Sequence, residues 1–291
     1  MDSGTQMDVK KRIHNTSEMT TDPAGRKVLI LKDEQALRIA GECDCKTHDV
    51  YTMALKEGIC PYRYIRNREC ISLEEQLRIA ESRVAIVGAG GLGGNVILLL
   101  ARLGIGHLVV VDQDVFDETN LNRQALCSQR ALGKPKCEEA VLAVGSINPG
   151  VQVFPHRLKL DRSNAVETLA GCDLVVDALD NVQDRLVLEE AAKELGIPLV
   201  HGALAGFEGQ LMTIFPGDPG LKQLYGNEGS DLDRSKRPEA VLGVPALMPS
   251  LVATFQAMEA LKIILGRGKT FRKAMVHVDL ETGQMDEFSF E

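Results

Sequence analysis

From Arg83 onward, short apolar runs alternate with longer segments of helical periodicity. Five runs have the length and composition of buried strands, at 84–87, 108–111, 151–154, 174–178 and 198–201. The segments at 93–103, 135–144, 163–170 and 182–195 have helical patterns, with Pro135 suited to a first turn and Gly196 to a helix end. This alternation predicts a Rossmann-like, doubly wound α/β fold with a mainly parallel sheet covered on both faces.

The C-terminal part of the chain predicts an antiparallel extension of that sheet. Residues 209–215 have the pattern of a further strand, and 275–280 with 285–290 predict a closing hairpin around Gly283. An apolar helix is expected at 247–265. The segment 216–245 is rich in Gly, Pro, Asp and Arg, which predicts a long, mobile loop of the kind that is often functional.

The first 60 residues do not follow the alternating pattern. Residues 1–26 are polar and predict a flexible or loosely attached arm. Helical patterns follow at 33–40 and 72–80, and Ser72 with Glu75 fits a capping box at the start of the second helix. We expect residues 1–60 to be an N-terminal extension, whose role the sequence does not indicate, and residues 61–291 to form the main domain.

Composition and charge exclude several classes of protein. The net charge of -8 argues against a broad nucleic-acid-binding surface, so phosphate chemistry should depend on a few placed cations. No apolar run approaches the roughly 18–20 residues of a membrane helix, and the polar N-terminus is unlike a signal peptide. Seven cysteines, none after Cys172, favour reduced thiols in a cytoplasmic protein.

A glycine-rich turn predicts a nucleotide site. Gly88, Gly90, Gly91 and Gly93 lie between a strand and a helix, where backbone N–H groups and the helix dipole favour phosphate. Asp112, at the end of the next strand, is placed to accept hydrogen bonds from ribose hydroxyls. These features do not say which nucleotide binds.

A second cluster distinguishes the candidate nucleotides. If Asn120, Arg123 and Gln124 lie at the start of a short helix, they share one face and present two amides and a guanidinium to the site. NAD requires no such group. A triphosphate does, because its charge must be neutralised as pyrophosphate leaves.

Five motifs together resemble the ThiF/MoeB/HesA family, which is similar to the adenylating domain of ubiquitin-activating enzymes. The order and spacing of the family are found at 88–94, 112–114, 120–124, 133–136 and 177–181, and the resemblance runs from about Tyr62 to the C-terminus. It implies that residues 61–291 bind ATP–Mg²⁺ and adenylate the C-terminal glycine of a small β-grasp protein ending in Gly-Gly. Such a step belongs to sulfur-carrier or cofactor biosynthesis and releases pyrophosphate.

The resemblance also implies roles for single residues. Asp112 would bind the ribose, and Lys136 would neutralise the α/β-phosphate region. Asn120, Arg123 and Gln124 would contact the phosphates, and Asp180 would hold Mg²⁺. Arg66 resembles an arginine that reaches the partner's γ-phosphate across a homodimer interface.

The chain departs from the family in its cysteines. Many relatives bind a structural zinc through two Cys-x-x-Cys pairs, whereas 216–224 contain no cysteine and none follows, so we expect no zinc there. Residues 233–245 also lack the cysteine that forms a thioester or persulfide in relatives. Cys127, Cys137 and Cys172 are expected in the core. Two interpretations, a metal site or packing, remain open for Cys43, Cys45, His48, Cys60 and Cys70.

Two other functions remain open on the sequence alone. An NAD-dependent oxidoreductase would use the same glycine turn and Asp112, but it would leave Arg123 and Lys136 without a role. A non-catalytic module that only binds a β-grasp protein would need none of the charged residues.

Overall fold

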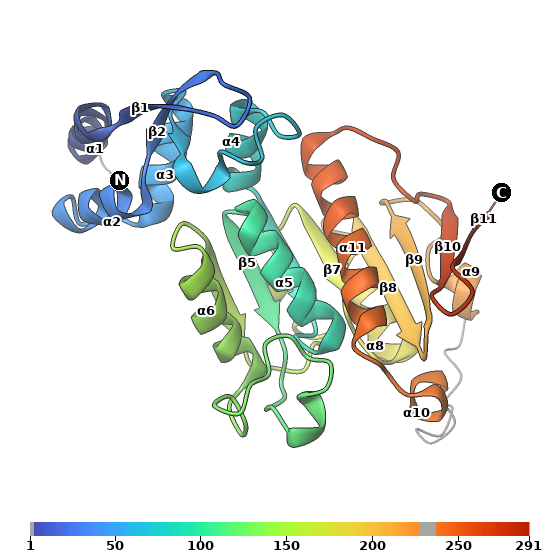
Figure 1. Ribbon diagram of the computed structural model, residues 1–291. Coiled ribbons are helices and arrows are strands. Elements are labelled where there is room, and N and C mark those ends of the chain that lie inside the picture. The colour runs from blue at the N-terminus through green and yellow to red at the C-terminus, as the bar shows by residue number, and fades with distance from the viewer. Residues whose placement is uncertain (1–2, 227–236, 291) are drawn as a thin grey trace.

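A computed structural model of the chain describes residues 3–226 and 237–290. Its centre is an eight-stranded sheet in the order β11-β10-β9-β8-β7-β4-β5-β6 (Figure 1). The strands are β4 (Arg83–Val87), β5 (His107–Val111), β6 (Gln152–His156), β7 (Leu174–Asp177), β8 (Leu199–Ala205), β9 (Glu208–Ile214), β10 (Ala274–Asp279) and β11 (Gln284–Ser289). Strands β4 to β8 are parallel, and β9, β10 and β11 extend the sheet in antiparallel pairs. The predicted fold class is confirmed.

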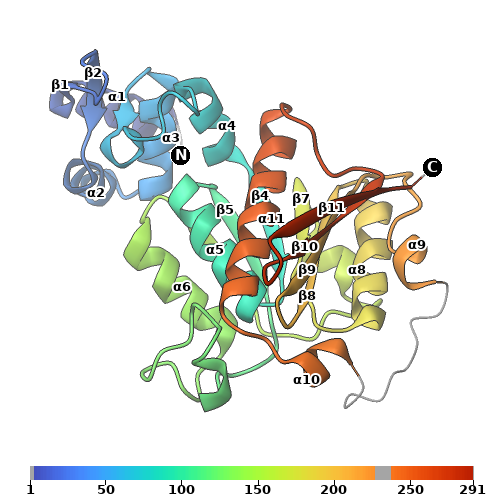
Figure 2. The same cartoon turned by 45° about the vertical axis from the view of Figure 1, so that its right-hand side comes forward.

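Helices cover both faces of this sheet, because alternate strand residues point to opposite sides. One apolar cluster joins strand residues such as Val84 and Ile86 to α4 (Leu73–Glu81), α5 (Gly91–Leu103), α6 (Lys136–Ile147) and α11 (Leu247–Leu265). A second cluster joins the alternate residues Ala85 and Val87 to α7 (Ala165–Leu169) and α8 (Val182–Leu195). Figure 2 shows α11 and α8 on opposite sides of the sheet.

Helix α11 corrects one expectation from the sequence. It is 19 residues long, and by length and composition alone it is apolar enough to cross a membrane, so the expectation that no apolar run reaches this length is wrong. Val252, Ala253 and Ala260 of this helix are buried in the core beside α5 and the sheet. Its apolar character is therefore explained by packing inside the domain.

The expectation of a flexible arm at residues 1–26 is wrong for the part that the structure describes. Residues Ser3–Thr16 form α1, and Glu18–Thr21 form β1. Val9 and Ile13 of α1 are fully buried against α2 (Asp33–Glu42) and α3 (Thr47–Lys56). Apolar side chains one turn apart thus fasten an otherwise polar helix to a small core.

The N-terminal extension also contains a separate three-stranded sheet, in the order β1-β2-β3, with β2 at Lys27–Leu31 and β3 at Cys60–Pro61. The N-terminal extension joins the large sheet domain through polar contacts, one partly buried and one buried. Arg63, within the short helix η1 (Tyr62–Tyr64), pairs with Asp33 of α2 and donates to the carbonyl of Ile147 at 2.7 Å. His48 of α3 lies 3.2 Å from the carbonyl oxygen of Gly150.

Two local predictions can be compared directly with the structure. The capping box at α4 is confirmed, because the Ser72 hydroxyl accepts from the Glu75 N–H at 3.1 Å and the Glu75 carboxylate accepts from the Ser72 N–H at 2.8 Å. The expected loop at 216–245 contains the short helices α9 (Lys222–Tyr225) and α10 (Pro238–Leu242). Its middle, residues 227–236, lies outside the described part of the chain.

Candidate active site

A cleft of about 540 Å³ lies at the carboxyl ends of β4, β5 and β7. Its walls come from the β4–α5 turn, the segment after β5, the start of α6, the β7–α8 turn and strands β8 and β9. In doubly wound sheets this edge is where ligands bind. The predicted residues among its lining are Gly88, Gly90, Gly91, Asp112, Arg123, Gln124, Lys136 and Asp180.

The glycine turn is shaped by close backbone contacts. Gly88 has φ of +97°, and a Cβ there would lie 2.5 Å from the carbonyl oxygen of Ala178. A Cβ on Gly93 would lie 1.8 Å from the carbonyl oxygen of Gly88, so this residue must lack a side chain. Gly93 is not among the lining residues. It lets α5 approach β4, and so it places Gly91, the first residue of α5, in the cleft.

Asp112 is fixed by the glycine turn. Its two carboxylate oxygens accept hydrogen bonds from the backbone N–H groups of Ala89 at 2.7 Å and Asp114 at 2.8 Å. Burial raises the pKa of Asp112, and the nearby charge of Lys136 opposes that shift. Each carboxylate oxygen keeps a second lone pair, so the residue can still accept from a ligand hydroxyl.

The predicted amide and guanidinium cluster is only partly assembled at the cleft. Arg123 and Gln124 line it, and Gln124 is buried, with its Oε1 atom without a hydrogen-bond partner in the described part of the molecule. Asn120 ends the short helix η2 (Glu118–Asn120), where its Oδ1 accepts from the N–H of Asp117 at 3.0 Å. It is not a lining residue, and its phosphate contact stays a prediction.

Lys136 occupies an unusual position for a cation. It is the first residue of α6, where the helix dipole disfavours positive charge, and it is buried to all but 7%. Its ammonium lies 3.2 Å from a carboxylate oxygen of Asp114, a half-exposed partner on the same rim of the cleft. The Lys136 ammonium is therefore paired with Asp114 at the wall of the cleft.

Asp180 and Arg66 lie in different parts of the molecule. Asp180 follows β7, is exposed, and lines the cleft with one carboxylate oxygen 3.3 Å from the Asn181 amide. Arg66 lies on the surface after η1 and does not line the cleft of its own chain. Its predicted contact therefore requires a second subunit and stays a prediction.

The donor set fits a magnesium nucleotide. Mg²⁺ is usually held by one or two carboxylates together with phosphate oxygens and waters, and the exposed carboxylate of Asp180 suits that role. Arg123, Lys136 and the N-terminus of α5 line the same cleft. The amide oxygen of Gln124, which has no hydrogen-bond partner among residues 3–226 and 237–290, provides a further polar group beside the glycine turn.

The cysteines show no comparable arrangement. In residues 3–226 and 237–290, no three His, Cys, Asp or Glu side chains gather as a metal site would need. Cys43 and Cys45 pack against the small N-terminal core, and Cys60 is fully buried. Cys137 and Cys172 are buried as expected, and Cys127 packs at the edge of the main core.

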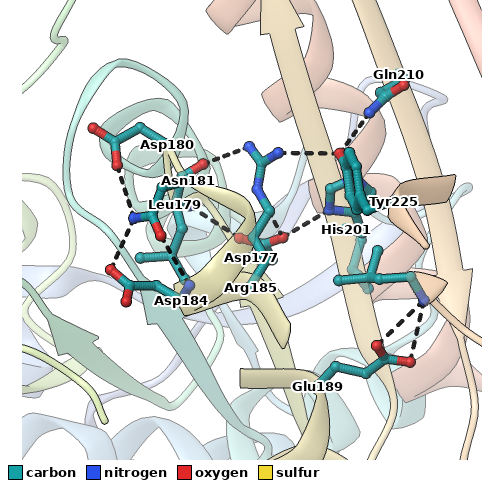
Figure 3. Close-up of polar contacts among 12 residues, drawn as sticks. Asp177, Leu179, Asp180, Asn181, Asp184, Arg185, Glu189, His201, Gln210 and Tyr225 are labelled. Carbon is teal, nitrogen blue, oxygen red and sulfur yellow. Dashed lines mark hydrogen bonds and ion pairs between the residues drawn. The ribbon is translucent and has the colours of Figure 1, made fainter. Parts of the chain in front are cut away.

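A buried polar network beside Asp180 was not predicted from the sequence (Figure 3). Asp177, Arg185, His201, Tyr225 and Gln210 come from five different elements and meet at the wall of the cleft. The only signal in the sequence is a histidine within the apolar run of β8. Sequence spacing gives no indication that side chains so far apart along the chain come together.

Comparison with known proteins gives the family of this chain. The model of the ThiF family matches residues 64–291. The SAMP-activating enzyme E1 of Haloferax volcanii is 41% identical over 207 residues, covering 71% of this chain and 76% of that protein. The sulfur carrier protein adenylyltransferase of Thermus thermophilus is 37% identical over 205 residues, covering 67% and 74%. A probable molybdopterin-synthase adenylyltransferase of Porphyra purpurea is 33% identical, and the match spans 58% of its length.

Solved structures agree with the fold. The crystal structure of PaaA has a TM-score of 0.67 at 20% identity and covers 95% of this chain and 99% of that one. The structure of E. coli MccB with ATP has a TM-score of 0.65 at 19% identity, covering 88% and 82%. The likeness to PaaA extends over almost the whole chain. The match to the family model and the sequence identities, together with the geometry of the site, show that the chain belongs to the ThiF family.

Proposed function

We propose that residues 61–291 form an ATP- and Mg²⁺-dependent adenylyltransferase. It activates the C-terminal glycine carboxylate of a small ubiquitin-like β-grasp protein that ends in Gly-Gly and serves as a sulfur carrier. The observation that carries this proposal is the meeting of Arg123, Lys136 and Asp180 around the glycine turn. The names of the similar adenylyltransferases support it, since they refer to SAMP and to a sulfur carrier protein.

The proposed reaction joins two anions. A carboxylate oxygen of the acceptor attacks the α-phosphorus of ATP and forms an acyl-phosphate bond. The bond to the β-phosphate oxygen breaks, and its electron pair leaves with pyrophosphate. No general base is needed, because a C-terminal carboxylate is ionised at neutral pH.

The chain's own residues then act by neutralising charge and fixing positions. Arg123 and Lys136 offset the repulsion between the carboxylate and the phosphates, and the N-terminus of α5 adds its dipole. Magnesium held at Asp180 would supply further neutralisation of the phosphate oxygens. Strands β8 and β9, which form the other wall of the cleft, provide an extended surface along which an acceptor tail can lie.

Dimerisation is part of the proposal. Arg66 lies outside the cleft of its own chain, and in the family resemblance the corresponding arginine acts on the partner's nucleotide. A symmetric homodimer would bring it to the second site.

The test is ATP–pyrophosphate exchange with purified full-length chain. The acceptors are small ubiquitin-like proteins ending in Gly-Gly from the same genome, each with a matched variant that lacks the last glycine. We expect Mg²⁺-dependent exchange with an intact acceptor and none with its truncated form. Binding of such an acceptor without any exchange would instead favour a non-catalytic binding module.

A further inference from the structure

The network beside Asp180 has a defined direction of hydrogen bonding. The Tyr225 hydroxyl oxygen accepts from Arg185 Nη1 at 3.1 Å and from Gln210 Nε2 at 2.7 Å. Both of its acceptor positions are then occupied, so its own hydrogen points to His201 Nε2, 3.2 Å away. His201 is consequently neutral, and its Nδ1–H donates to Asp177 Oδ2 at 2.7 Å.

This network holds the turn that carries Asp180. Asp177 Oδ1 accepts from the backbone N–H of Leu179 at 3.0 Å, and Arg185 Nη2 donates to the carbonyl of Leu179 at 2.6 Å. Both backbone polar groups of Leu179 are therefore held by buried side chains (Figure 3). Because Leu179 directly precedes Asp180, the network sets the course of the backbone from which the Asp180 carboxylate projects.

Tyr225 is the member of the network that belongs to a different region of the fold. It ends α9, and α9 is anchored separately, since both oxygens of Glu189 accept from the Leu221 N–H at 3.2 Å. The Asp218 carboxylate, just before α9, is paired with Arg272 at 2.9 Å. The position of α9 is thus held by residues of α8 and of the segment that precedes β10.

The same turn is contacted from beyond α9 as well. Residue Arg237, which precedes α10, donates through Nη1 to the carbonyl of Asp180 at 3.5 Å. Arg237 thus contacts the backbone of residue 180 directly, whereas Tyr225 acts on residue 179 through Arg185.

We propose that Tyr225 is a positioning residue for Asp180: its hydroxyl orients Arg185, which holds the Leu179 carbonyl, and His201, which holds Asp177 against the Leu179 N–H. The inference rests on the proposed function insofar as Asp180 is taken to hold Mg²⁺. The arrangement of the turn itself does not depend on that function.

Tyr225→Phe tests this inference, because it removes the hydroxyl and keeps the ring. Tyr51→Phe serves as the control, since the buried Tyr51 donates its hydroxyl hydrogen to Asp33 at 2.5 Å in the N-terminal core and does not line the cleft. We expect Tyr225→Phe to speed hydrogen–deuterium exchange at the 178–181 backbone by about tenfold, the scale of one lost buried hydrogen bond. Tyr51→Phe should leave that exchange unchanged.

A second readout connects the turn to magnesium. The Mg²⁺ concentration for half-maximal binding of a non-hydrolysable ATP analogue should rise several-fold in Tyr225→Phe and stay at the wild-type value in Tyr51→Phe. Wild-type exchange rates at 178–181 in Tyr225→Phe would overturn the inference, as would equal acceleration in both variants. If the wild-type protein bound no magnesium nucleotide, the proposed function would fail, while the exchange rates would still decide the role of Tyr225.

Discussion

At the scale of single residues, the site contains charged side chains whose positions are not explained by stabilisation of the fold. Lys136 begins a helix against the dipole and lies buried beside an exposed carboxylate. Asp180 lines the cleft, and its carboxylate accepts a 3.3 Å hydrogen bond from the Asn181 amide. Groups held in unfavourable or unpaired positions at the edge of a sheet are typical of ligand sites.

Asp180→Asn tests the assignment of the metal carboxylate. The substitution keeps the size of the side chain and removes its charge, so the fold should be unaffected. We expect ATP–pyrophosphate exchange to fall by about 10²-fold or more, the usual scale for a preorganised charged group at a transition state. Asp286→Asn, on the exposed strand β11, serves as the control and should retain full activity. Near-normal exchange by Asp180→Asn would remove this residue from the proposed mechanism.

How far the sequence predicts the site can be judged from these residues. Lys136 begins a helix and Asp180 follows a strand end, which is where the motifs place them, and Arg123 and Gln124 line the cleft from the turn after η2. Asn120 differs, since its side chain caps a turn, and only the local course of the chain reveals this. The network of His201 and Tyr225 was not predicted, because the partners of these residues come from elements distant in the sequence.

At the scale of elements, the alternation of strands and helices gave the correct architecture, and the polar first helix was the main failure. Only Val9 and Ile13 of α1 are fully buried. Two apolar side chains in a polar segment do not distinguish a docked helix from a flexible arm. The difference arises from α2 and α3, which supply the surface that those side chains cover.

The junction of β4 and α5 gives a second prediction. Gly93→Ala places a Cβ against the Gly88 carbonyl, so it should lower the free energy of unfolding by about 2–3 kcal/mol. Gly145→Ala in α6 is the control, because its Cβ meets no atom within 4 Å. Gly145→Ala should raise the free energy of unfolding by about 0.5–1 kcal/mol. Urea unfolding of the two variants measures both effects, and equal stabilities would contradict the proposed packing.

At the scale of the whole molecule, buried histidines link stability to pH. Burial lowers the pKa of His48, His107 and His201 below the usual value near 6.5, although hydrogen bonds to His48 and His201 oppose this. Below that pH the unfolded chain binds more protons than the folded one, so stability falls as the pH drops from about 7.5 to about 5.5.

His48→Asn isolates one of these histidines, since an amide can still donate to the Gly150 carbonyl. The loss of unfolding free energy between the two pH values should be smaller in this variant than in the wild type. His14→Asn, at an exposed position of α1, should not reduce the loss. An undiminished loss in His48→Asn would show that this joint between extension and main domain does not sense pH.

The proposed homodimer makes a further prediction about Arg66. If Arg66 acts on the partner's site, mixing inactive Arg66→Ala with inactive Asp180→Asn creates mixed dimers with one intact site each. Random exchange of subunits should then restore about a quarter of wild-type activity. Mixtures that remain inactive after subunit exchange, or a protein that is monomeric by light scattering at micromolar concentration, would contradict an action across the interface.

The central claim is that the cleft binds a magnesium triphosphate. Isothermal titration of the wild-type protein with ATP–Mg²⁺ and with NAD tests it most directly, with Arg123→Ala as the matched variant. The account predicts saturable binding of ATP–Mg²⁺ at one site per chain, strongly weakened in Arg123→Ala, and no comparable binding of NAD. Tight binding of NAD without binding of ATP would contradict it and favour an oxidoreductase.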